Sequence, residues 1–203
     1  MDEEVIYVVS GIMRSGSSMM MKALEAGGME LLYDPTRDEE NETVQFNGEQ
    51  YEVNPGGSYE SYRYLSALRP AEWVDKCRGK VIKNLYPGLM TLPKIDVFGV
   101  KYKILFMLRD PVEIEMSWVV SFHNLTPKET IGVNMEYYAV LMDDICSSIE
   151  EARDSEVIQV HYDDVMDNPK AAFRKIRDAG WPISPKKAAV VIDPRLHRMK
   201  REN

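Results

Sequence analysis

The stretch VVSGIMRSGSSMMMKALEAGG, residues 8–28, decides the fold class. It predicts a buried strand, a glycine-containing loop and the first turns of a helix, an arrangement with which many α/β proteins hold a phosphate group. Gly11 and Gly16 permit a tight turn. The backbone N–H groups of residues 15–18 would then point at an anion held at the positive end of the helix dipole.

The loop departs from the ATP-binding pattern GxxxxGK[ST] at one important position. The spacing from Gly11 to Gly16 is kept, but Ser17 stands where the pattern has lysine, and Arg14 inside the loop is the cation. In ATP-type loops the lysine reaches the β- and γ-phosphates and the hydroxyl binds magnesium. We therefore expect a diphosphate-like ligand. The alternative is a plain strand-to-helix connection with capping serines and a surface arginine.

Composition sets the class of protein. The chain has 203 residues, of which 44% are hydrophobic and 29% charged, which is typical of one globular domain. The formal net charge of -8 disfavours nucleic acid and anionic membranes as partners. Cys77 and Cys146 lie far apart and form no zinc motif, and no apolar run is long enough to span a bilayer. These features predict a cytoplasmic protein.

Four short apolar runs alternate with segments of helical period. The predicted strands are 5–10, 80–85, 102–108 and 156–162, and the predicted helices include 17–27, 112–123, 134–152 and 169–179. The runs show little alternation, as expected for strands that are covered on both faces of a parallel sheet. The sequence therefore predicts a three-layer, P-loop-type α/β domain, with a central parallel sheet flanked by helices, over residues 1–203.

One segment breaks the pattern. Residues 32–64 are polar, acidic and rich in Asn, Gly and Pro, and they lack a sustained period. Long irregular insertions in compact domains are usually functional lids or disordered segments. Tyrosines within the segment favour a lid.

The motifs MRSGSS (13–18) and ILFMLRDPVEIEMSW (104–118) together resemble those of the sulfotransferases that use 3′-phosphoadenosine 5′-phosphosulfate, PAPS. In that family a P-[KR]-S-G-[ST]-[ST] loop binds the 5′-phosphosulfate. A strand ending in arginine, with serine eight residues later, binds the 3′-phosphate. The resemblance implies that the cofactor is PAPS, with 3′,5′-adenosine bisphosphate (PAP) as its product, and that no metal is required. It implies these donor-binding residues: Arg14, Ser15, Gly16, Ser17, Ser18, Arg109 and Ser117.

Two weaker matches extend the resemblance. VIKNLYP (81–87) is similar to the family's K-x-x-x-P strand end, which implies that Lys83 lies near the oxygen between phosphate and sulfate. VHYDDVMDNP (160–169) is similar to its Y-E-D-x-x-x-[DN]-P segment, which implies that Tyr162 lies against the adenine. The second segment alone is equally compatible with a strand end followed by an Asp-rich turn and a helix. A lysine at the carboxyl end of a buried strand favours a ligand site, because open α/β sheets bind ligands there.

The general base is the position where the sequence departs from the family. Leu85 stands where the cytosolic branch has histidine. His161 falls in a predicted strand, where a buried core histidine is the usual outcome. Other branches use a carboxylate after the first helix, and Glu60 is preferred here over Asp34 and Glu39, because NPGGSYE could turn the chain back toward the site. Any of these carboxylates could instead belong to a solvated acidic surface.

These observations predict a sulfotransferase that moves a sulfuryl group from PAPS to a hydroxyl or amine of a small-molecule or soluble glycan acceptor. Lys83, Arg14 and Glu60 would be its catalytic residues. Two alternatives remain open. A P-loop kinase or hydrolase would need GK[ST] and a magnesium-binding Asp, for which Asp110 is a candidate, although Asp-Pro equally predicts a helix N-cap. A noncatalytic PAP- or nucleotide-binding module of the same fold would explain Leu85.

Overall fold

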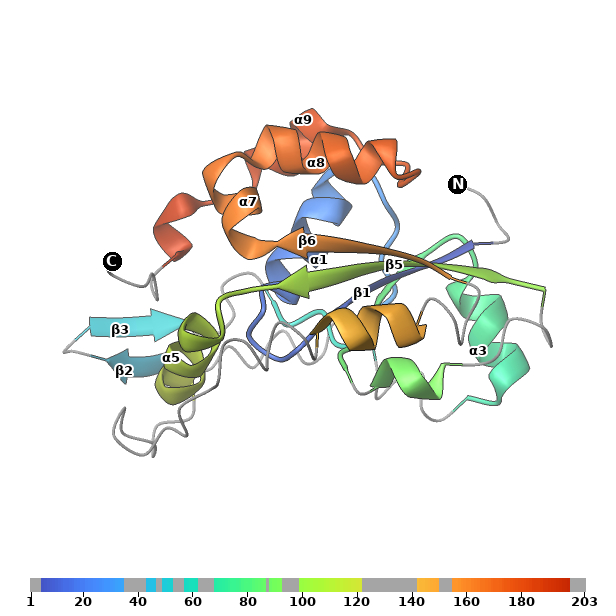
Figure 1. The fold of residues 1–203 in the computed structure, drawn as a ribbon, viewed down its shortest axis with the longest axis horizontal. Helices are drawn as coiled ribbons and strands as arrows, with labels where there is room; N and C mark the ends of the chain where they lie inside the picture. Colours follow the sequence, from blue (N-terminus) through green and yellow to red (C-terminus); the bar gives the residue numbers. More distant parts are fainter. Residues whose placement is uncertain are drawn as a thin grey trace.

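A four-stranded parallel sheet forms the centre of the molecule (Figure 1). The computed structural model describes residues 5–34, 43–46, 49–52, 57–61, 68–86, 88–92, 99–121, 142–149 and 155–197. The strand order is β4-β1-β5-β6, with β1 at Val5–Gly11, β4 at Val81–Lys83, β5 at Lys101–Leu108 and β6 at Glu156–His161. Each strand lies within two residues of its predicted position, so the predicted α/β class is confirmed.

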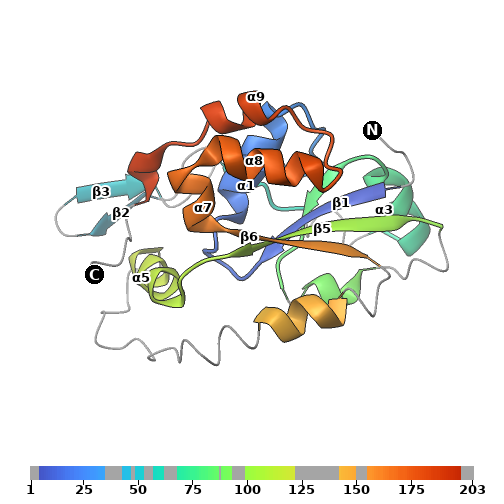
Figure 2. The same cartoon turned by 45° about the horizontal axis from the view of Figure 1, so that its top comes forward.

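Helices cover both faces of this sheet (Figure 2). One face carries α1 (Ser17–Ala26), α7 (Tyr162–Asp167), α8 (Pro169–Asp178) and α9 (Pro185–Val190), and the other carries α3 (Pro70–Cys77) and the helix at 142–149. The remaining elements are α5 (Pro111–Ser121), the hairpin strands β2 (Thr43–Phe46) and β3 (Glu49–Glu52), and the 3-10 turns η2 (Gly88–Thr91) and η3 (Pro194–Leu196). None of the helices in the described ranges is long and apolar enough to cross a membrane.

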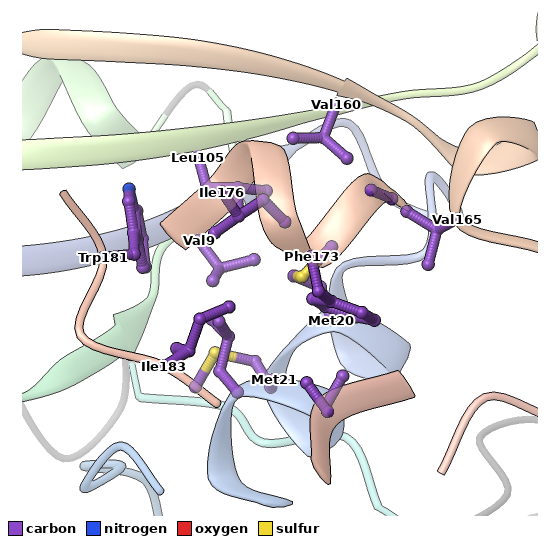
Figure 3. Packing of buried hydrophobic residues seen from close by; sticks show 14 of the residues in the cluster. Val9, Met20, Met21, Leu105, Val160, Val165, Phe173, Ile176, Trp181 and Ile183 are labelled. Atoms are coloured by element: carbon purple, nitrogen blue, oxygen red, sulfur yellow. The ribbon is translucent and has the colours of Figure 1, made fainter. Parts of the chain in front are cut away.

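Two-sided burial explains the continuous apolar strands. Along β1, Tyr7 and Val9 join one hydrophobic core, while Ile6 and Val8 join the core on the opposite face. Successive side chains of a strand point to opposite faces, so a strand buried on both faces must be apolar throughout. Figure 3 shows the first core, in which Phe173 and Trp181 approach the sheet from the helical layer.

Local signals in the sequence set the ends of the helices. At the start of α8 the side chain of Asn168 accepts a hydrogen bond from Ala171 N at 3.3 Å, and Pro169 is the first helical residue. A side-chain acceptor at the N-cap satisfies one of the free N–H groups of the first turn. After α1, Gly28 takes a φ of 102°, which glycine adopts without strain. Helix α1 therefore ends where the sequence predicts.

Two sequence predictions need correction. Within the segment 32–64, predicted to be irregular, β2 and β3 form an antiparallel hairpin with Phe46 opposite Glu49. The Asn-Gly pair between these strands is a strong hairpin signal that the prediction overlooked. His161 is exposed instead of buried, because β6 is the edge strand of the sheet. Residues 134–141 and 150–152 of the predicted helix lie outside the described residues.

The strand order fixes where a ligand can bind. β1 lies between β4 and β5. The chain therefore passes from β1 to β4 on one side and then crosses over to β5 on the other side. In open α/β sheets, ligands bind beyond the carboxyl ends of the strands at such a point. The loop after β1 and the Arg109–Asp110 pair after β5 both lie at this edge. Figure 1 shows α5 and the hairpin at the same end of the sheet, and α5 contacts β2.

Candidate functional site

The loop between β1 and α1 has the backbone of an anion cradle. Gly11, Arg14 and Gly16 all have positive φ values, of 137°, 73° and 98°. Arg14 is the notable member of this set, since a non-glycine residue in this region is uncommon and often marks a functional site. The hydroxyl of Ser15 is fully buried at the head of α1 and makes no hydrogen bond within the described part of the chain. A buried hydroxyl of this kind is available to a ligand.

Gly16 must be glycine for two independent reasons. Its φ of 98° strains any other residue, and a Cβ there would lie 2.5 Å from Cδ2 of Tyr162. Tyr162 begins α7 and is buried, so its ring cannot retreat into solvent. The close approach of Gly16 and Tyr162 therefore joins the loop after β1 to the segment after β6.

We expect Gly16→Ala to destabilise the fold by about 1–3 kcal/mol, because it combines backbone strain with a displaced aromatic ring. Gly28→Ala is the matched control, since Gly28 has a similar φ of 102° but no atom within 4 Å of its added Cβ. Urea denaturation gives both free energies of unfolding. Equal losses in the two variants would show that the contact with Tyr162 contributes nothing.

Arg14 joins the two motifs that lie about 100 residues apart in the sequence. Its Nε donates to Ser117 Oγ at 2.9 Å, and its carbonyl oxygen accepts a hydrogen bond of 3.1 Å from Arg109 Nη1. Arg109 leaves the carboxyl end of β5, and Ser117 lies two turns along α5. The predicted donor-binding residues of the two motifs are therefore neighbours in space.

Two guanidinium groups lie close together in this part of the site. Burial, followed by the nearby Arg109 cation, lowers the pKa of Arg14, while Tyr162 acts in the opposite direction. Arginine stays charged in proteins even so, and the two cations repel each other. A bound anion would relieve this repulsion, so the electrostatics favour an anionic ligand between the loop and α5.

Lys83 is the last residue of β4 and binds a second group of polar atoms. Its Nζ donates to Ser18 Oγ at 3.0 Å, to Ser58 O at 2.6 Å and to Glu60 Oε1 at 2.7 Å. The Lys83 side chain is 4% exposed and that of Glu60 is 26% exposed. The strand-end lysine and the favoured carboxylate thus form an ion pair, with Glu60 reachable from solvent.

The segment at 57–61 is held against β4 by hydrogen bonds from its neighbours. Ser61 Oγ donates to Leu32 O at 2.6 Å and accepts from Lys83 N at 3.1 Å, and Asp34 N donates to Glu60 O at 3.1 Å. These bonds bring Glu60 back to the end of the sheet, as NPGGSYE suggested. The third candidate base, Glu39, lies outside the described residues.

A third group of side chains surrounds Arg109. Its Nε donates to Glu113 Oε2 at 3.0 Å, and the same oxygen accepts from His197 Nε2 at 2.9 Å, with Asp163 Oδ1 3.5 Å from that nitrogen. In the described ranges, Glu113, Asp163 and His197 place ligand atoms within 4.8 Å of one another, as a metal site would. A divalent cation bound there would lie next to the positively charged guanidinium of Arg109, which would repel it. We therefore interpret the group as a hydrogen-bonded ion-pair network.

Asp163 gives a prediction for the dependence of stability on pH. Burial and the Glu113 carboxylate raise its pKa above the ordinary value of 3.8, while the His197 contact partly offsets this rise. A carboxyl group whose pKa is higher in the folded state than in the unfolded state stabilises the fold below the unfolded-state pKa. That stabilisation is lost as the pH rises through the folded-state pKa. Asp163→Asn should therefore stabilise the protein at pH 7 and have no effect near pH 3. Because the Asp163 side chain is 53% exposed, solvent screens the charge and limits the gain to about 0.5 kcal/mol. Thermal melts of the wild type and the variant between pH 3 and pH 7 measure the difference in stability. A difference that stays constant over this range would contradict the raised pKa of Asp163.

Sequence reasoning missed the partners of Arg109. Glu113 stands four residues after Arg109, which is the spacing of a helical ion pair, and this signal was available. His197 had no such signal, because its approach depends on the path of the last helices.

Asp110, the alternative magnesium ligand, accepts from Val112 N at 2.7 Å and caps α5. That contact is the N-cap expected for Asp-Pro.

No protein-family model matches the sequence, and no curated protein is significantly similar to it. Among solved structures, the crystal structure of mouse sulfotransferase SULT7A1 complexed with PAP aligns at 15% sequence identity with a TM-score of 0.48. The alignment covers 96% of this chain and 64% of that chain, so the present chain spans less than two thirds of that protein's length.

Proposed function

We propose that the chain is a PAPS-dependent sulfotransferase acting on a hydroxyl or amine of a small-molecule or soluble glycan acceptor. The observation that carries the proposal is the meeting of two motifs at Arg14. Its side chain contacts Ser117, and its carbonyl oxygen contacts Arg109. A phosphate loop alone would fit many nucleotides, whereas a second cationic group beyond the loop suits a nucleotide with two separate phosphate positions.

The residues of the site fit the two ends of this donor. The N–H groups at the head of α1, the buried Ser15 hydroxyl and Arg14 would hold the 5′-phosphosulfate. Arg109 and Ser117 would hold the 3′-phosphate, since a guanidinium forks two hydrogen bonds to a phosphate. The adenine ring of the nucleotide would lie on the side of Tyr162. Ser17 at the lysine position gives no cation for a γ-phosphate, which makes a triphosphate the poorer fit.

PAPS supplies an activated sulfuryl group: the bond from sulfur to the bridging phosphate oxygen breaks, a bond to the acceptor oxygen or nitrogen forms, and the electron pair stays on PAP. Lys83 and Arg14 stabilise the negative charge that builds on that bridging oxygen. Glu60 takes the proton from the acceptor, as a general base must be reachable by the substrate. Its 26% exposure leaves the carboxylate within reach of an acceptor.

The acceptor would enter beside Glu60, at the edge of the segment 57–61. The polar pair of Lys83 and Glu60 can orient a hydroxyl or an amine for attack. The choice between a small molecule and a soluble glycan depends on the remainder of the segment 32–64, much of which lies outside the described residues.

The test is sulfuryl transfer from labelled PAPS to a panel of phenols, aliphatic alcohols, amines and oligosaccharides, with PAP release followed by chromatography. We expect PAP and a labelled product to form together from at least one acceptor class, without added metal. Binding of PAP with no transfer to any acceptor would favour the noncatalytic module. Turnover of ATP with magnesium would favour the kinase or hydrolase.

A further inference from the structure

Arg109 is fixed by groups from three parts of the chain. Its Nε donates to Glu113 Oε2 at 3.0 Å, its Nη1 donates to Arg14 O at 3.1 Å, and its Cζ lies 4.3 Å from the centre of the Tyr162 ring. Within the described residues its Nη2 makes no hydrogen bond, so that nitrogen is available to an anion. How well Arg109 can bind a phosphate depends on how firmly Glu113 and Tyr162 stay in place.

His197 contacts both of these supporting groups. Its Nε2 donates to the same Glu113 oxygen that accepts from Arg109, at 2.9 Å, and its ring meets the ring of Tyr162 edge-on at 5.1 Å and 82°. The His197 side chain is 8% exposed, and that of Glu113 is 4% exposed. Little solvent reaches these contacts, so removal of the imidazole leaves a gap beside both supports of Arg109.

The backbone before His197 forms a short turn that places this side chain beside Glu113 and Tyr162. The carboxylate of Asp193 accepts from Arg195 N at 3.0 Å, which starts the 3-10 turn η3, and His197 N donates to Pro194 O at 3.1 Å. The turn ends at Leu196, and the next residue enters the site. A segment 84 residues beyond Glu113 therefore supports the arginine after β5.

We propose that His197 is a positioning residue for recognition of the 3′-phosphate. It holds Glu113 and Tyr162, and these orient the Arg109 guanidinium toward the ligand. This inference rests on the proposed function, because it assumes that Arg109 faces a phosphate at the 3′ position of the nucleotide. His197 itself does not touch the donor.

The experiment compares PAP with adenosine 5′-phosphate, AMP, which lacks only the 3′-phosphate. The ratio of the two affinities in the full chain, measured by calorimetry with EDTA present, isolates the contribution of the 3′ position. We expect His197→Ala to weaken PAP binding about tenfold more than AMP binding. Both nucleotides share the adenine contact with Tyr162, whereas only PAP loses the oriented Arg109, and a misoriented guanidinium loses about what one hydrogen bond to a charged group contributes. In turnover, the KM for PAPS should rise while kcat stays constant.

His197→Gln provides the conservative rescue, since its side-chain amide can still donate to Glu113. We expect it to recover most of the preference for PAP. His161→Ala, at the exposed edge of β6, is the matched control and should behave like the wild type.

Three results would overturn the inference: an equal loss of PAP and AMP binding in His197→Ala, no loss of either, or no recovery in His197→Gln while that variant is folded by circular dichroism. A wild-type protein that binds PAP no better than AMP would instead contradict the proposed function, and the inference with it. The two failures are therefore distinguishable.

Discussion

Arg109→Ala should weaken PAP binding about 10- to 100-fold, because a hydrogen bond to a charged group contributes about 1.5–3 kcal/mol. Arg109 extends from the carboxyl end of β5 beside Arg14 and contributes one of the two guanidinium charges of the site. AMP binding should change by less than about threefold, since AMP has no phosphate at the 3′ position. Calorimetric titration of both ligands measures the difference.

The substitution also removes the partner of a buried carboxylate. Arg109 and Glu113 side chains are 7% and 4% exposed, and an unpaired buried charge destabilises a fold by about 3–5 kcal/mol. The double variant Arg109→Ala, Glu113→Gln separates the two effects, because it removes the cation without leaving a carboxylate unpaired. It should fold and still bind PAP weakly. Arg174→Ala, an exposed arginine on α8, is the control. Full PAP affinity in the double variant would exclude Arg109 from the 3′-phosphate site.

Lys83→Met and Glu60→Gln should each slow turnover about 10²- to 10⁴-fold, which is the usual range for the loss of a general base or of an electrostatic stabiliser. In the proposed mechanism both residues act on charge that moves in the transition state, so the KM for PAPS should change far less than kcat. Methionine keeps the volume of Lys83 in its buried position, and glutamine keeps the shape of Glu60. Steady-state kinetics at saturating acceptor give the two parameters.

The double variant tests whether Lys83 and Glu60 act together. Their side chains are 2.7 Å apart, so the losses should not add. Lys101→Met, which removes an exposed lysine of β5, is the control for the loss of a cation. If Lys83→Met weakened PAP binding as much as Arg109→Ala did and left kcat unchanged, Lys83 would have no part in the chemistry.

The strands and the anion loop could be predicted because their signals are local. Strands buried on both faces require continuous apolar runs, and the turn between β1 and α1 requires Gly11 and Gly16. The sequence also predicted that Arg109 and Ser117 would face one site, since eight residues make about two turns of one helix. The structure adds that Arg14 contacts both of them.

Two other members of the site, His197 and the carbonyl oxygen of Ser58, could not be found in this way. His197 reaches Glu113 through the path of α7, α8, α9 and η3, and this path depends on packing in the first core instead of on any local pattern. The carbonyl oxygen of Ser58 accepts from Lys83. A backbone acceptor has no sequence signature. His161 was expected in the core because edge and central strands cannot be distinguished without the order of the sheet.

We propose that the site between β1, β5 and α5 binds a 3′-phosphorylated adenine nucleotide. The experiment is calorimetric titration of the wild-type chain with PAP, AMP, ADP and ATP, each with and without magnesium. We expect PAP to bind at least about tenfold more tightly than the others, with no effect of magnesium, because two separate cationic groups would each bind one phosphate. Preferential binding of ATP with magnesium, or no nucleotide binding at all, would contradict it.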